Sequence, residues 1–119
     1  MQRFDQFKSS FFNAYRGLRY VIWHEKNFQT ELAVAVLVIM AMVYYRVTRP
    51  EMIVLFMVIM LVLIMEILNT IMERVVDILK PRIHPYARVI KDLMAASVLL
   101  SATLAVIIGL IIFIPYIFS

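Results

Sequence analysis

The sequence predicts an all-α membrane protein with three transmembrane helices and an N-terminal amphipathic helix on the membrane surface. Of its 119 residues, 64% are hydrophobic, and the mean hydropathy of +0.89 is far above that of soluble proteins. A soluble domain of this size could not bury so much apolar surface. The apolar residues gather in three long segments, with basic residues beside them. We expect one membrane domain over residues 1–119.

The first element is predicted from large apolar residues that recur every three or four positions near the N-terminus. These residues are Phe4, Phe7, Phe11, Tyr15, Leu18 and Ile22. Arginine, lysine and asparagine fall mostly on the other face, which is typical of a helix lying at a membrane surface. We therefore expect a surface helix over about residues 4–23. The alternative is a helix that packs its apolar face against the rest of the protein.

Three spans follow from the apolar segments. The segments are Leu32–Tyr45, Met52–Leu68 and Leu93–Phe118. The third is long enough to cross a bilayer unaided, whereas the first two are short. They reach spanning length if the first begins near Phe28 and the second continues through Asp77. The predicted spans are about 28–46, 51–79 and 86–118.

The connections and the basic residues predict the orientation. Pro50 suits a helix start after a tight turn, and Pro81 and Pro85 are expected to end the second span and begin the third. Five Lys or Arg residues precede the first span, two lie in the first connection, five in and around the second, and none after the third. The positive-inside rule then places the N-terminus in the cytoplasm and the C-terminus outside.

Other compositional features narrow the class of function. The basic patches adjoin apolar segments, which favours an anionic membrane surface over a nucleic acid as partner. The chain contains no cysteine, so disulfides and thiolate metal sites are excluded. The first thirty residues lack the pattern of a cleavable signal peptide. With only Gly17 and Gly109, neither a P-loop nor a glycine-rich kinase loop is possible.

A polar stripe enters the second span. Glu66, Asn69, Glu73 and Asp77 are spaced by three, four and four residues, so they share one helical face. If the helix begins at Glu51 at the outer interface, the three carboxylates lie roughly 22, 33 and 39 Å along it. With a hydrocarbon core about 30 Å thick, the first lies at acyl-chain depth, the second at the cytoplasmic interface and the third in water. A carboxylate in an apolar setting is suited to take a proton, and interfacial carboxylates suit Mg²⁺.

More charged residues are expected at the same cytoplasmic level. Glu25 precedes the first span, and Lys91 and Asp92 begin the third. Each taken alone is explained equally well by ordinary polarity near a membrane surface. Their shared depth with the polar stripe favours a functional site.

Structural alternatives remain open for the stripe itself. The structural alternative for Glu66 and Asn69 is that they form hydrogen bonds between helices. Glu73 and Asp77 are explained as well by a solvated helix end, and His84 by a capping role. The nine methionines are interpreted as apolar filling of the core or bilayer.

The segment that contains the stripe also resembles a known sequence signature. The segment Glu66-Ile-Leu-Asn-Thr-Ile-Met-Glu-Arg-Val-Val-Asp77 resembles the signature of the small prokaryotic membrane lipid kinases, which comprise diacylglycerol kinase and undecaprenol kinase. Similar flanking elements are Gly17-Leu-Arg19, Glu25-Lys-Asn-Phe28, His84-Pro85 and Lys91-Asp92. One departure is Ile71, where the family usually has a small residue.

The resemblance implies three membrane helices plus a surface helix, a homotrimer with shared active sites, and MgATP-dependent phosphorylation of a lipid hydroxyl at a bacterial inner membrane. It implies that Glu66 is the general base and that Glu25 and Glu73 hold Mg²⁺. The implied ATP-binding residues are Asn13, Glu25, Asn69, Glu73, Asp77, Arg82, His84, Lys91 and Asp92. The implied lipid-binding residues are Arg19, Phe28, Glu31 and Glu66.

Two other functions are alternatives to a lipid kinase. One is a small oligomeric cation or proton transporter that uses Glu66 as its carrier site. The other is a non-catalytic membrane subunit. A transporter needs a polar path to both faces, and the apolar run Met52–Met65 offers none toward the outside. Between the two lipids, the Glu25–Phe28 and His84–Ala87 stretches resemble the undecaprenol branch more, and both substrates remain open.

Overall fold

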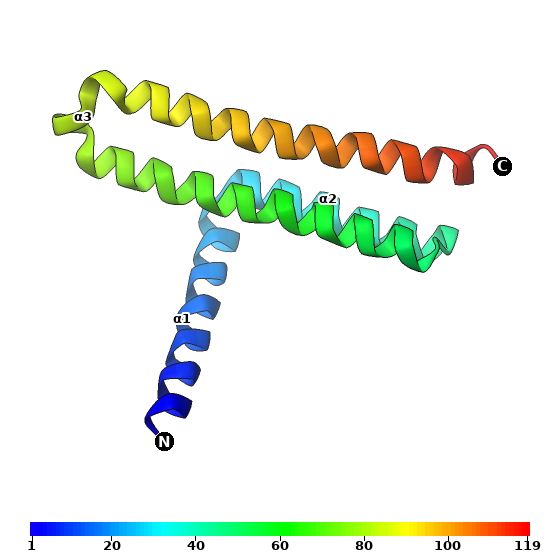
Figure 1. Cartoon of the computed structure of the whole chain (residues 1–119), viewed down its shortest axis with the longest axis horizontal. Coiled ribbons are helices and arrows are strands. Elements are labelled where there is room, and N and C mark those ends of the chain that lie inside the picture. The colour runs from blue at the N-terminus through cyan, green and yellow to red at the C-terminus, as the bar shows by residue number, and fades with distance from the viewer.

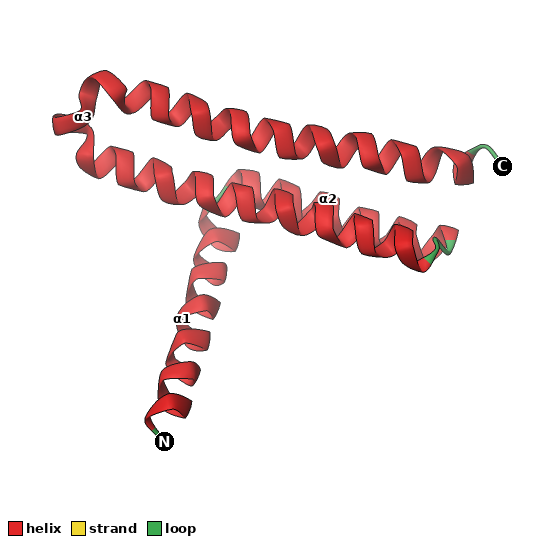
Figure 2. Ribbon diagram, in the orientation of Figure 1, coloured by secondary structure: helices red, strands yellow, loops and turns green.

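The structure is a computed structural model that describes residues 1–119. The chain is helical almost throughout and has no strand (Figure 2), which confirms the predicted all-α class. Its helices are α1 (Gln2–His24), α2 (Lys26–Tyr45) and α3 (Arg49–Ile117). α2 packs along α3, and α1 leaves this bundle transversely (Figure 1).

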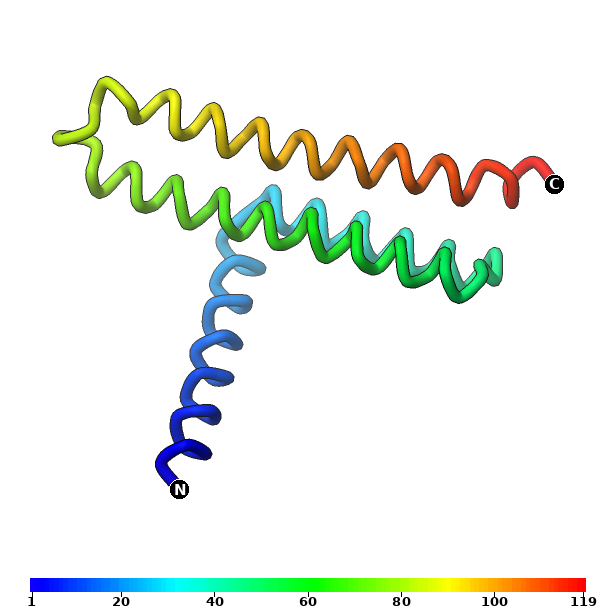
Figure 3. Tube along the Cα trace, in the orientation of Figure 1, coloured from blue at the N-terminus to red at the C-terminus, as the bar shows by residue number.

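Helix α3 folds back on itself. Helical hydrogen bonding runs through Pro81 and Pro85, and only Ile83 leaves the helical region, with φ −112° and ψ 19°. The expected connection between two separate helices is therefore reduced to a kink. Both prolines lack a backbone donor, and each disfavours helical geometry in the residue before it. The tube in Figure 3 reverses here, so the first arm of α3 (residues 49–82) runs antiparallel to the second arm (residues 84–117).

Helices α2 and α3 are long and apolar enough to cross a membrane. Only 14 of the 119 residues are buried within the chain, and large apolar side chains are exposed along both arms of α3. So much exposed apolar surface is unfavourable in water, whereas in a membrane it contacts lipid acyl chains. The fold is that of a membrane protein, and the three crossings stay a prediction.

The predicted surface helix corresponds to α1. Phe4, Phe7 and Phe11 are 68%, 70% and 71% exposed, so the apolar face of α1 is not packed on the rest of the chain. This arrangement favours the membrane-surface interpretation over packing against the protein, because an unpartnered aromatic stripe needs an apolar environment.

The turn between α2 and α3 contains a motif that the sequence reading missed. Thr48 and Glu51 form a capping box, in which the Glu51 amide donates to Thr48 Oγ1 at 3.4 Å and the Thr48 amide donates to Glu51 Oε1 at 2.9 Å. Arg46 is left-handed, with φ 52° and ψ 54°, and closes α2. Pro50 lies in the first turn of α3, as predicted.

A hydrophobic cluster joins α2 and both arms of α3 at this end of the bundle. Its buried members are Met42, Val47, Leu55 and Ile112. Tyr45 packs against the rings of Phe113 and Tyr116. The Tyr116 hydroxyl also donates a hydrogen bond to the carboxylate of Glu51. The open ends of the two arms are therefore held together, which fixes the relative position of the elements that carry the polar stripe.

Candidate active site

Glu66 lies where two stripes of the first arm of α3 meet. The buried stripe consists of Leu55, Val58, Val62, Glu66 and Thr70, spaced by three or four residues. Glu66 is only 5% exposed. The side chain turns inward between helices because it occupies a core position of the stripe, and the predicted depth of Glu66 and its contact with lipid stay predictions.

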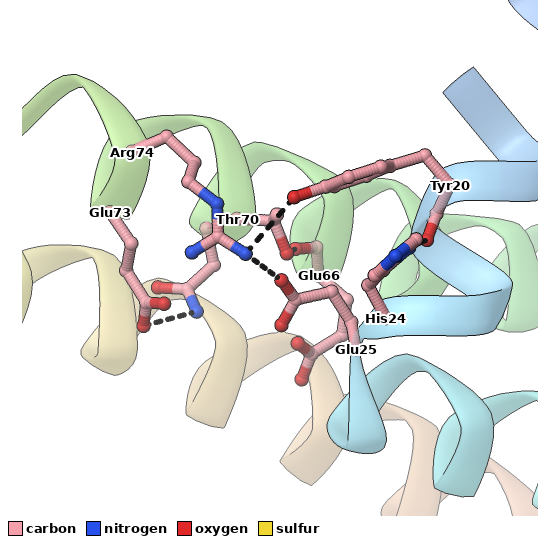
Figure 4. Close-up of polar contacts among 8 residues, drawn as sticks. Tyr20, His24, Glu25, Glu66, Thr70, Glu73 and Arg74 are labelled. Carbon is pink, nitrogen blue, oxygen red and sulfur yellow. Dashed lines mark hydrogen bonds and ion pairs between the residues drawn. The ribbon is translucent and has the colours of Figure 1, made fainter. Parts of the chain in front are cut away.

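The carboxylate of Glu66 accepts no hydrogen bond from the protein, although Thr70 Oγ1 donates to the Glu66 backbone carbonyl at 3.1 Å. Acidic side chains near it include Glu31, Glu73 and Glu25. Figure 4 shows Glu66 between the first arm of α3 and the junction of α1 with α2. A carboxylate without a donor partner, close to other carboxylates, is available to accept a proton.

Arg74 connects the polar stripe to the N-terminal elements. Its Nη2 atom lies 2.7 Å from Glu25 Oε1 and 3.4 Å from the Tyr20 hydroxyl (Figure 4). Glu25 is the single residue between α1 and α2, with the extended conformation φ −111° and ψ 111°. One guanidinium therefore ties α1, the α1–α2 junction and α3 together. Sequence reasoning counted Arg74 only as a basic charge and missed Tyr20.

Asn69 and Glu73 act as a pair one turn apart. Asn69 Nδ2 donates to Glu73 Oε1 at 3.2 Å, which leaves the second carboxylate oxygen without a donor. Glu25 similarly keeps one oxygen outside its ion pair with Arg74. The chain contains no cluster of three or more His, Cys, Asp or Glu side chains that could hold a metal. Two carboxylates nevertheless fit Mg²⁺, since this ion is usually bound through one or two carboxylates and completes its shell with water and phosphate oxygens.

The last carboxylate of the stripe contacts the second arm of α3. Lys91 Nζ donates to Asp77 Oδ1 at 2.9 Å. This ammonium lowers the pKa of Asp77, with further contributions from Lys80 and Arg74. Because both side chains are about half exposed, the ion pair is worth little to stability. It places a carboxylate and a cation together at the kinked end of the bundle, at the level predicted for the nucleotide.

Several expected site residues lie apart from this group. Arg82, His84 and Asp92 are exposed around the kink and contact none of the residues near Glu66 through side-chain hydrogen bonds. Asn13 lies near the middle of α1, where it accepts a hydrogen bond from Arg16. Their assignment to ATP stays a prediction.

The expected lipid-binding residues are also spread over two elements. Arg19 lies on α1 beside Tyr15 and Trp23, in a shallow surface depression. Phe28 is buried in the first turn of α2, with 3% exposure. Glu31, one turn further, is the only charged residue lining an apolar groove of about 320 Å³ between α2 and the two arms of α3. Of these expected residues, the structure places only Glu31 beside Glu66.

Comparisons with known proteins are consistent with this arrangement. Residues 12–113 match the family model of prokaryotic diacylglycerol kinase. The chain is 34% identical over 111 residues to an undecaprenol kinase of Bacillus subtilis (strain 168), covering 93% of this chain and 90% of the relative. It is 35% identical over 111 residues to a diacylglycerol kinase of Synechocystis sp., covering 92% of this chain. It spans 63% of that second relative's length.

Proposed function

Because the chain belongs to the prokaryotic diacylglycerol kinase family and is therefore a lipid kinase, we propose that it transfers the γ-phosphoryl group of ATP to the hydroxyl of a membrane alcohol at the cytoplasmic face. The observation that carries the proposed site is Glu66, a residue only 5% exposed at the end of an apolar stripe, whose carboxylate accepts no hydrogen bond within the chain. Membership of a kinase family argues against the alternative function of a cation or proton transporter.

In the proposed reaction, the lipid hydroxyl oxygen attacks the γ-phosphorus and the bond from that phosphorus to the β,γ-bridging oxygen breaks. ADP leaves with the bond's electron pair, and the hydroxyl proton passes to the Glu66 carboxylate. Catalysis of this kind rests mainly on position and on charge stabilisation. The apolar stripe around Glu66 favours a lipid hydroxyl as acceptor over water.

Glu25 and Glu73 are the residues proposed to hold Mg²⁺, which when bound would neutralise negative charge on the phosphates. Each has one carboxylate oxygen outside the contacts within the chain. Arg74 fixes the position of Glu25 by its 2.7 Å contact, and Asn69 fixes that of Glu73. Lys91 and Asp77 are proposed to contact the nucleotide at the kinked end, with Arg82, His84, Asp92 and Asn13 as further ATP-binding residues.

The proposed substrate is undecaprenol rather than diacylglycerol. In support, the Bacillus relative, whose name is undecaprenol kinase, is covered over 90% of its length, whereas the diacylglycerol kinase relative is covered over 63%. The stretches Glu25–Phe28 and His84–Ala87 also resemble the undecaprenol branch of the family more than the diacylglycerol branch. We also propose that Arg19, Phe28 and Glu31 lie along the lipid path.

The proposed assembly is a homotrimer with active sites shared between subunits, in a bacterial inner membrane. In support, predicted ATP-binding residues around the kink and on α1 lie apart from Glu66 within one chain, so a neighbouring subunit could complete the site. The basic residues favour a cytoplasmic N-terminus and an outer C-terminus.

The direct test uses the purified protein in phosphatidylcholine vesicles with γ-labelled ATP and Mg²⁺. Undecaprenol or diacylglycerol is added in separate reactions, and label is followed into the lipid fraction. Faster labelling of undecaprenol at equal mole fraction supports the full proposal. Preference for diacylglycerol overturns the substrate choice alone, and labelling of neither lipid overturns the kinase proposal for these alcohols.

A further inference from the structure

The apolar groove between α2 and the two arms of α3 leads to Glu66. Its wall on the first arm runs from Leu55 to Leu63, and Glu66 is the next residue on the same face, three residues beyond. Glu31 lines the groove and is also a charged neighbour of Glu66. The lining of the groove therefore ends one helical turn short of Glu66 on the first arm, and it is apolar except for Glu31.

The size of the groove limits what it can hold. Leu55 to Leu63 rises about 12 Å, so a volume of about 320 Å³ gives a mean cross-section of about 27 Å². A helix with its side chains is about 10 Å across, or roughly 80 Å² in section, and is too wide. Carbon atoms of neighbouring molecules pack about 4 Å apart, so the section suits one hydrocarbon chain.

Two small residues keep the groove open. Gly109 and Ala105 lie one turn apart on the second arm of α3 and line the groove. A Cβ atom added at Gly109 would meet no atom within 4 Å, so the space beside it is unfilled. Because Gly109 lines the groove, a large side chain at this position is expected to take up groove volume that a bound chain would occupy.

We propose that this groove seats one hydrocarbon chain of the lipid substrate, with the hydroxyl delivered to Glu66, and that Gly109 and Ala105 are specificity-determining residues. The inference rests on the proposed function. In a bilayer, tails are already in an apolar medium, so the groove selects by shape rather than by hydrophobic transfer. The groove holds the part of a single-chain alcohol that lies next to its hydroxyl, whereas the second chain of a two-chain lipid is left outside.

Cross-linking tests the groove independently of catalysis. The probe is a long-chain prenol that carries a photoreactive diazirine about 12 Å from its hydroxyl, within the stretch that the groove covers beyond Glu66, in phosphatidylcholine vesicles. We expect adducts on the second arm between residues 105 and 113, and their loss in Gly109→Phe. The matched control is Ile111→Phe, since Ile111 is 68% exposed on the outer surface and does not line the groove. Adducts spread evenly over the lipid-facing surface, or adducts unchanged in Gly109→Phe, overturn the proposal.

Kinetics give the second readout. Gly109→Phe should lower kcat/KM for the long-chain prenol by about tenfold or more, with little change for a five-carbon prenol too short to fill the groove. Wild-type protein that cross-links in the groove but labels no lipid shows that the proposed function fails while the groove assignment holds. The chain has no cysteine, so Gly109→Cys introduces a single thiol. A disulfide between two copies through this thiol would assign the groove to subunit contact and overturn the proposal.

Discussion

Lys91 Nζ lies 2.9 Å from Asp77 Oδ1, and this contact joins the two arms of α3 near the kink. The opposite ends of the same arms are joined by the hydrogen bond from the Tyr116 hydroxyl to Glu51. One long helix is thus folded into a hairpin that is held by polar contacts at both ends. Glu66 and Glu73 lie along its first arm between these two contacts, and Glu25 lies at the junction of α1 with α2.

Acidification should weaken the Asp77–Lys91 contact in a defined window. Because Lys91 lowers the pKa of Asp77 below its ordinary value of 3.8, the contact contributes fully above that value and is lost as pH falls through the lowered pKa. Thermal unfolding of detergent-solubilised protein, followed against pH, should show a small loss of stability below about pH 4 that is absent in Asp77→Asn. An identical pH profile in the variant would contradict the assignment.

Glu66→Gln should abolish lipid phosphorylation while leaving nucleotide binding intact. Glutamine keeps the shape of the side chain but cannot accept the proton, so kcat should fall by about 10²–10⁴-fold. The control is Asp5→Asn, which removes an exposed carboxylate on α1 remote from the site. Turnover of label into lipid and binding of a fluorescent ATP analogue separate the two effects, and an active Glu66→Gln protein would remove Glu66 from the role of base.

Glu73→Ala removes a proposed Mg²⁺ ligand and should raise the Mg²⁺ concentration needed for half-maximal activity by about tenfold or more, since loss of even an outer-shell partner of a ligand typically costs that much. Asn69→Ala should cause a smaller increase, because it removes only the 3.2 Å hydrogen bond that orients Glu73. The measurement is a Mg²⁺ titration at fixed ATP. An unchanged Mg²⁺ dependence in Glu73→Ala would contradict the metal assignment.

Arg74 is a positioning residue, since it contacts Glu25 and Tyr20 rather than the reacting atoms. Arg74→Ala should lower activity and raise the Mg²⁺ requirement, with little loss of thermal stability because the ion pair is partly exposed. Arg74→Lys should recover part of the activity, because an ammonium keeps the positive charge beside Glu25 but lacks the rigid planar fork of the guanidinium. A large drop in melting temperature with an unchanged Mg²⁺ requirement would indicate a purely structural role.

The turn between α2 and α3 should matter for stability and not for catalysis. Thr48→Ala removes the capping box and should cost about 1 kcal/mol of unfolding free energy. Thr103→Ala is a suitable control, because Thr103 only donates to the Leu99 carbonyl on its own helix. Thermal unfolding should separate the two variants, and kcat/KM for lipid should be unchanged in both; a loss of activity in Thr48→Ala alone would link this end to the site.

The sequence by itself determined the helical class, the apolar segments, the surface helix and the polar stripe from Glu66 to Asp77. These features depend on local periodicity and composition, which adjacent residues carry. The stripe also carried the family resemblance that the comparisons confirmed.

Only the tertiary structure decided which side of the helix each polar group faces and what it meets there. Glu66 proved to be buried between helices, Arg74 to join Glu25 and Tyr20, and Lys91 to pair with Asp77. These relationships depend on how the arms of α3 fold back at Ile83 and on where α2 packs. They arise between residues far apart in the chain, so spacing along one helix could not reveal them.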